Sequence, residues 1–285
     1  MKKSSVDSNG FDDIGFVVQP LVDVLSHEKV RELRKRLSLV CEHRITPTRV
    51  LGELGTEVNQ IFEKAFEYIN CSEIMGHDVK LMPIFHVARN YHVSRTETPF
   101  AGWHRDAGGE YRYAGCRKLL NDPEYRFAKI GIYLQLNDTT AGGSIDVIPG
   151  SHRWGRLRYS LIANLFEFSR IGIKFFGKNR LVAFDHWVCK KMGVRSLSLK
   201  EMEIALFDSR LIHRGTPHQG LSTKDSIPLN FKAFESDATD KFVLYCHVGN
   251  SLGVDSYFLD RSRRPGNESE FKFWVEDYAF FKKLD

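Results

Sequence analysis

Two histidines and one aspartate have residue types and a spacing that suit a metal ion. Among eleven histidines, only His104 is followed two residues later by an acid, Asp106. Side chains at positions i and i+2 of a β-strand lie on one face, so these two side chains would converge. His213 follows the apolar pair Leu211 and Ile212 and offers a second imidazole. The three residues together predict a metal centre.

This ligand set leaves two kinds of metal chemistry open. Two histidines and one carboxylate, with open coordination positions opposite them, form the facial triad that holds Fe(II) in non-haem oxygenases. Zinc with the same three ligands would instead favour hydrolysis at one open position. A single His-x-Asp pattern also arises by chance. Whether it marks a metal site, and which metal that site holds, therefore depends on the surrounding sequence.

The elements that must position these residues change character along the chain. Ser26 has the type of a helix N-cap, and apolar residues recur at helical spacing from there to about residue 40. A second apolar stripe predicts a helix over about 56–70. From residue 79 the apolar period becomes two, which is typical of strands. The predicted strands are Val79–Val93, Ala128–Asn137, Ile145–Ile148, Glu203–Ile212, Ile227–Glu235 and Phe242–Val248.

Helices followed by many short strands favour a sandwich or barrel of strands with helices packed outside it. Since no repeat or low-complexity linker divides the chain, residues 1–285 form one predicted domain. Residues 157–202 interrupt the strand pattern as an insert, which would serve either as a lid or as a buried packing helix. A helix lying on a membrane surface is a third alternative, disfavoured by the few basic residues in Leu161–Phe176.

Composition excludes several classes of protein. With 42% hydrophobic residues the chain has more apolar content than disordered proteins, and it holds no apolar run long enough to cross a bilayer. A net charge of +5, dispersed along the chain, gives no basic face for nucleic acid. The five cysteines include no C-x-x-C pair, and the N-terminus has no secretory pattern, so a cytoplasmic location is expected.

Several separated motifs resemble the phytanoyl-CoA dioxygenase family of Fe(II)/2-oxoglutarate oxygenases. Residues 11–18 and 26–30 are similar to the family's opening strand and helix, and 103–106 to its His-x-Asp strand. The run 143–152, Gly-Ser-Ile-Asp-Val-Ile-Pro-Gly-Ser-His, is close to its most recognisable signature. Residues 205–213 resemble the strand that carries its distal histidine. The resemblance covers roughly 11–40 and 80–235 and leaves the insert outside.

The resemblance implies a double-stranded β-helix, an eight-stranded jelly roll with N-terminal helices outside. It implies that His104, Asp106 and His213 hold Fe(II), with 2-oxoglutarate and dioxygen as cosubstrates and a small, apolar or amphipathic substrate. Hydroxylation is the expected outcome. Halogenation is disfavoured, because related halogenases have Ala or Gly where this chain has Asp106. Ile130, Ile132 and Leu134 are expected to line the methylene side of the cosubstrate.

One departure from the family concerns the residue that anchors 2-oxoglutarate. The family places an arginine eleven residues after the distal histidine, to pair with the far carboxylate, and here that position is Lys224. A lysine binds a carboxylate as a point charge and lacks the two-pronged geometry of arginine. Arg89, on the strand before the His-x-Asp motif, is the substitute candidate.

A rival hypothesis is a β-barrel binding module, not an enzyme, whose triad is vestigial or holds zinc. The lysine in place of arginine is the feature that favours it. The sequence carries no prediction about oligomeric state.

Overall fold

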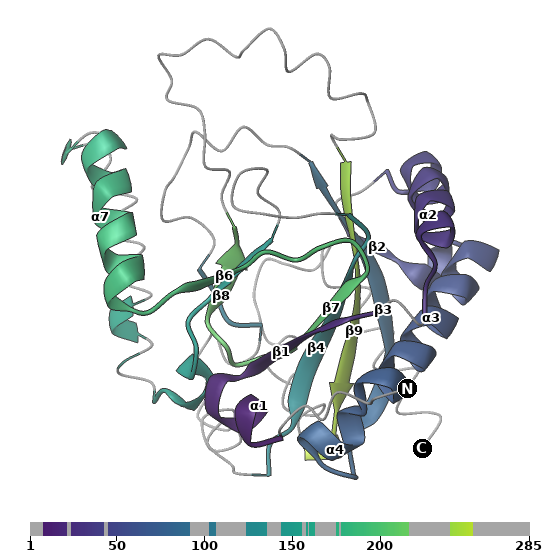
Figure 1. Ribbon diagram of the computed structural model, residues 1–285, viewed down its shortest axis with the longest axis horizontal. Coiled ribbons are helices and arrows are strands. Elements are labelled where there is room, and N and C mark those ends of the chain that lie inside the picture. The colour runs from purple at the N-terminus through teal and green to yellow at the C-terminus, as the bar shows by residue number, and fades with distance from the viewer. Residues whose placement is uncertain are drawn as a thin grey trace, which may run out of the picture.

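Two antiparallel sheets face each other, and helices cover the outer side of the larger one (Figure 1). The larger sheet has the strand order β1-β7-β4-β9-β3-β2 and the smaller one β6-β5-β8. This arrangement is the double-stranded β-helix, or jelly roll, that the family resemblance implies. The computed structural model describes residues 8–21, 24–42, 45–91, 103–106, 124–135, 144–155, 158, 160–162, 175–176, 178–216 and 240–252.

The larger sheet is built from strands that are distant in sequence. Its strands are β1 (Phe16–Pro20), β2 (Ile45–Pro47), β3 (Lys80–Tyr91), β4 (Phe127–Tyr133), β7 (Glu203–Asp208) and β9 (Asp240–Gly249). The strands of the smaller sheet are β5 (Ile145–Val147), β6 (Arg195–Leu197) and β8 (His213–Gly215). Strand β4 lies between β7 and β9, with Ile130 opposite Leu206 on one side and Cys246 on the other.

The helices precede most of the strands in the chain, and two of them cover the larger sheet. The α-helices are α1 (Ser8–Ile14), α2 (His27–Val40), α3 (Glu53–Ile69), α4 (Cys71–Met75) and α7 (Lys178–Lys191). Short 3-10 turns occupy Thr48–Val50 and Ser151–Arg153. Helix α2 begins where the sequence predicts, because the Ser26 side chain accepts a hydrogen bond from the Lys29 amide.

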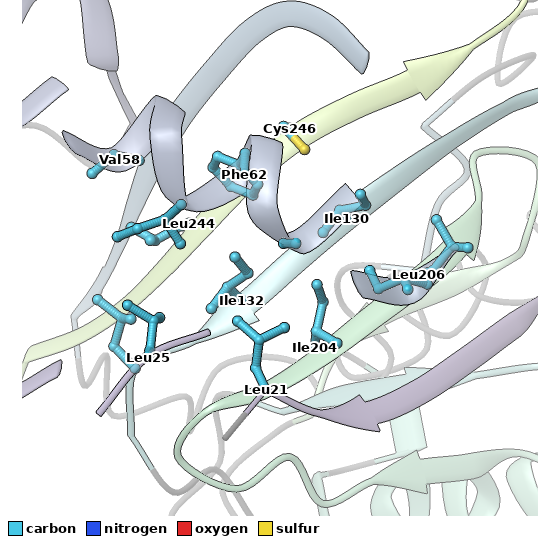
Figure 2. Packing of buried hydrophobic residues seen from close by; sticks show 14 of the residues in the cluster. Leu21, Leu25, Val58, Phe62, Ile130, Ile132, Ile204, Leu206, Leu244 and Cys246 are labelled. Carbon is cyan, nitrogen blue, oxygen red and sulfur yellow. The ribbon is translucent and has the colours of Figure 1, made fainter. Parts of the chain in front are cut away.

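The main core lies between α2, α3 and the outer face of the larger sheet. Figure 2 shows Val58 and Phe62 of α3 over Leu244 and Ile132 of the sheet. Phe62 and Ile132 are fully buried. Apolar residues at alternate strand positions and at helical spacing meet here, so this layer follows directly from the two periodicities of the sequence.

A second apolar cluster fills the space between the two sheets. Phe207, Tyr133 and Val243 of the larger sheet pack there against Ile145 and Val147 of the smaller one. Alternation along β4 and β9 therefore sends even-numbered side chains to the helices and odd-numbered side chains into the interior of the jelly roll.

The predicted strand Glu203–Ile212 is a shorter strand, β7, followed by a turn over residues 209–212. Strand β7 ends at Asp208, whose carboxylate accepts hydrogen bonds from the backbone and the side chain of Arg210. The Leu211 amide donates to the Asp208 carbonyl and closes the turn. His213 therefore opens β8 of the smaller sheet, which corrects its expected place at the end of an apolar strand.

Helix α7 lies within the 157–202 insert, for which a packing helix was one alternative, but apolar spacing did not predict its bounds. Its buried positions include Asp185, whereas Phe184 and Trp187 are exposed, so it shows no regular apolar stripe on its docked face. Strand β6 also comes from the 157–202 insert and pairs with β5, so part of the insert belongs to the jelly roll. The predicted strand Ile227–Glu235 and most of Leu161–Phe176 lie outside the described residues.

Replacing Phe62 by Ala should lower the free energy of unfolding by about 3–5 kcal/mol, because it leaves a cavity between α3 and the sheet. Urea unfolding followed by circular dichroism measures the change. Leu39→Ala on the exposed side of α2 is the control and should change stability by less than about 0.5 kcal/mol. Equal losses in both variants would contradict this account of the core.

Candidate metal centre

Reciprocal backbone hydrogen bonds join the two histidines of the predicted triad. The His104 amide donates to the His213 carbonyl at 2.9 Å, and the His213 amide donates to the His104 carbonyl at 3.0 Å. The bridge is antiparallel and places the imidazole rings 4.3 Å apart between centroids. Residues 103–106 thus extend the smaller sheet beside β8 by one isolated bridge.

Asp106 completes the cluster. Its Oδ1 lies 3.7 Å from His104 Nε2, and its Oδ2 lies 3.8 Å from His213 Nε2. One ligand atom from each of the three residues lies within 4.8 Å of the others. Asp106 and His213 are buried while His104 is half exposed, so the cluster is reached from the side of His104.

The protonation states of the buried ligands suit a divalent cation. Burial lowers the pKa of His213 to about 4, so its ring is neutral at physiological pH. Its Nδ1 lies 2.9 Å from the Leu211 carbonyl, which can only accept, so Nδ1 carries the proton and Nε2 keeps its lone pair. Burial opposes ionisation of Asp106, but Lys129 and both histidines outweigh it and hold the pKa of this carboxyl well below its usual range.

Lys129 is a part of the centre that sequence reasoning missed. Its Nζ lies 2.6 Å from Asp106 Oδ2, with the Tyr245 ring 5.1 Å away. The ammonium therefore fixes one carboxylate oxygen and leaves the other turned toward His104. The feature of the sequence that could have indicated its role is that Lys129 is the one charged residue of β4, a strand buried on both faces.

Aromatic side chains form the interior wall beside the centre. The Phe207 ring lies 5.1 Å from the His213 ring, and the hydroxyl oxygens of Tyr133 and Tyr245 lie 3.4 Å apart. All of these positions belong to the odd-numbered, inward face of their strands. This wall keeps bulk water from the buried side of the three ligands.

A buried ion cluster of Arg214, Asp146 and Asp185 contacts the segments that carry both histidines. Arg214, next to His213, donates from Nε to Asp146 of β5 at 2.9 Å and from Nη1 to Asp185 of α7 at 3.3 Å. Its guanidinium lies 4.6 Å from the ring of Trp103, the neighbour of His104. The cluster therefore ties α7 to the two segments that carry the histidines.

Arg89 and Ile132 are not brought together with the triad. Arg89 donates a hydrogen bond to the Cys41 carbonyl and lies 5.8 Å from the ring of Phe242, on the helix-covered face of the sheet. Ile132, with Ile130, also faces the helices. Their expected place beside the cosubstrate lies on the opposite face of the sheet, and burial alone does not distinguish the faces because both are largely buried. Lys224 lies outside the described residues.

The fold has counterparts among solved structures. HygX from Streptomyces hygroscopicus with iron bound matches at a TM-score of 0.50 and 14% identity, over 87% of this chain and 88% of its own. EvdO2 from Micromonospora carbonacea var. aurantiaca, complexed with 2-oxoglutarate, matches at a TM-score of 0.45 and 12% sequence identity. The match covers 88% of this chain and 93% of its own. EctD from S. alaskensis matches at a TM-score of 0.48 and 15% sequence identity, over 89% of this chain and 78% of its own. No protein-family model and no curated protein sequence matches the chain.

Replacing Arg214 by Met should lower the free energy of unfolding by about 3–5 kcal/mol, because Asp146 and Asp185 lose the cation that offsets their burial. Urea unfolding measures it. Arg153→Met removes an ion pair to Asp13 in which both side chains are exposed, and should cost less than about 1 kcal/mol. A stable Arg214→Met protein would show that the cluster contributes little to stability.

Proposed function

We propose that the protein is an Fe(II)- and 2-oxoglutarate-dependent dioxygenase that oxidises a C–H bond of a small apolar or amphipathic molecule. The observation that carries the proposal is the geometry of His104, Asp106 and His213 in a jelly roll: a neutral imidazole, an ionised carboxylate and a second imidazole converge on one point. This donor set fits Fe(II) and leaves positions for two further ligands. The iron bound to HygX, whose fold this chain shares, supports the choice of metal.

Bound iron with 2-oxoglutarate and dioxygen would supply C–H oxidation coupled to the release of succinate and carbon dioxide. The chain's own residues would prepare the centre for it. The Leu211 carbonyl orients the His213 ring, and Lys129 orients the Asp106 carboxylate. Phe207 excludes water from the buried side of the centre, and the exposed side of His104 gives the substrate its approach. We propose hydroxylation as the outcome.

The far carboxylate of 2-oxoglutarate needs a cation in the interior of the jelly roll. Lys224, the sequence-based candidate, lies outside the described residues, and the strand that follows β8 in the described part of the chain is β9, which begins at Asp240. Lys241, the second residue of that strand, is buried and has the inward parity of Val243. We therefore propose Lys241 as the anchor, with Lys224 as the alternative.

The rival proposal is a zinc-holding or non-catalytic binding module. The same three ligands would also serve zinc, and the release of succinate distinguishes the two proposals.

Replacing His104, Asp106 or His213 by Ala should abolish Fe(II)-dependent release of succinate from 2-oxoglutarate while circular dichroism shows an intact fold. Each change removes one of three ligands. Titration with Fe(II) or Co(II) under anaerobic conditions measures the loss of metal binding directly. Full metal affinity in Asp106→Ala would refute the triad, and tight zinc binding without succinate release by the unaltered protein would favour the rival module.

Replacing Lys241 by Met should weaken 2-oxoglutarate binding to the metal-loaded protein about 30- to several-thousand-fold, because an unpaired buried carboxylate costs about 2–5 kcal/mol. Calorimetry measures it, with 2-oxopentanoate, which lacks the far carboxylate, as the matched ligand whose affinity should not change. Arg89→Met, on the other face of the sheet, is the matched control and should leave binding unaltered. If only Lys224→Met loses affinity for 2-oxoglutarate, Lys224 and not Lys241 is the residue that pairs with the far carboxylate.

A further inference from the structure

Helix α7 turns its aromatic side chains outward. Its docked side holds Asp185 and Val188, which are 4% and 3% exposed, while Phe184 and Trp187 are 38% and 56% exposed. Residues three apart share one side of a helix, and these two rings stack 5.8 Å apart at an interplanar angle of 14°. The helix therefore carries a stacked aromatic pair on the side opposite its buried residues.

Other aromatic side chains lie just before this helix. Phe175 and Phe176 are 77% and 57% exposed. Among the large apolar residues that are exposed in the described part of the chain, every phenylalanine and tryptophan lies between 175 and 187. In Figure 1, α7 stands at the outer edge of the molecule, beside β6 and β8 and across the sheets from α2 and α3. We call the exposed side of α7 that carries Phe184 and Trp187 the aromatic face.

Positive charge accompanies the aromatic face. Arg180 lies one turn before Phe184, and Lys190 and Lys191 follow Trp187 by three and four positions, so these exposed residues lie on the same side of α7. The acidic residue of α7, Asp185, is buried against Arg214. No carboxylate of the helix therefore offsets its outward cations.

We propose that the outward side of α7 binds the surface of a membrane that contains anionic lipid. Helices that lie in the membrane interface combine tryptophan and phenylalanine with lysine and arginine, as this surface does. The aromatic rings would enter the headgroup region while Arg180, Lys190 and Lys191 pair with lipid phosphates. Within the described ranges no helix is long and apolar enough to cross a membrane, so the contact is one of surface attachment.

Charge argues for lipid over a second copy of this chain. A symmetric dimer through this surface would place the same patch against itself, so two sets of lysine and arginine would meet. Like charges in such proximity repel, whereas an anionic lipid surface complements them. The ion cluster around Arg214 fixes α7 to the jelly roll, so the surface is held in a constant orientation. The proposal does not depend on the oxygenase activity.

Co-sedimentation of the full chain with vesicles tests the proposal. The protein should bind vesicles of phosphatidylcholine mixed with phosphatidylglycerol, bind phosphatidylcholine alone far more weakly, and be released by high salt. Lys190→Gln with Lys191→Gln should weaken binding about 30-fold, which corresponds to about 1 kcal/mol for each charge removed. Phe184→Ser with Trp187→Ser should abolish it.

The control removes one exposed apolar side chain and one lysine from another exposed helix face. Leu39→Ser with Lys35→Gln on α2 should bind anionic vesicles as the unaltered protein does. Failure of the unaltered protein to bind anionic vesicles, or an equal loss in the control, would overturn the proposal. A dimer in gel filtration that the Phe184→Ser and Trp187→Ser changes convert to a monomer, with no vesicle binding, would also overturn it and assign the surface to self-association.

Discussion

One pair of backbone hydrogen bonds, between His104 and His213, holds together the centre on which the proposed chemistry depends. These bonds join segments that are far apart in the chain and set the two imidazoles side by side. Asp106 then follows from His104 by spacing, since the residue two positions on turns to the same side. A displacement of either segment along the bridge would separate the ligands, so the centre needs support from both sheets.

That support is electrostatic on one side and apolar on the other. Arg214 lies between Asp146 and Asp185 and beneath Trp103, so it holds the neighbours of both histidines at once. In the interior, Phe207 packs against His213. Buried ion pairs add little stability over an apolar core, but they require a defined geometry. Here that geometry sets the position of α7 relative to the metal ligands.

The two faces of strand β4 serve different parts of the molecule, one the main core and the other the metal centre. Ile130 and Ile132 face the helices and contribute to the main core, whereas Lys129 and Tyr133 face the interior. A shift of one residue would exchange the faces and bury a lysine under α3. The same alternation separates Arg89 from the metal centre, although it lies on a strand of the same sheet.

Sequence periodicity by itself determined the helices α2 and α3, most of the described strands and the general class of a sandwich or barrel of strands, because these depend on local patterns of apolar residues. The jelly roll in particular was implied by the resemblance of separated motifs to a known family. Residue types and spacing also singled out His104, Asp106 and His213 as candidate metal ligands, which the structure brings together. The choice of face for Ile132 and Arg89 required the tertiary structure, since both faces of those strands are buried and the pattern is ambiguous. Helix α7 was missed because an ion pair to Asp185 docks it in place of an apolar stripe. Lys129 entered the site only through a contact between distant strands, which no local pattern encodes.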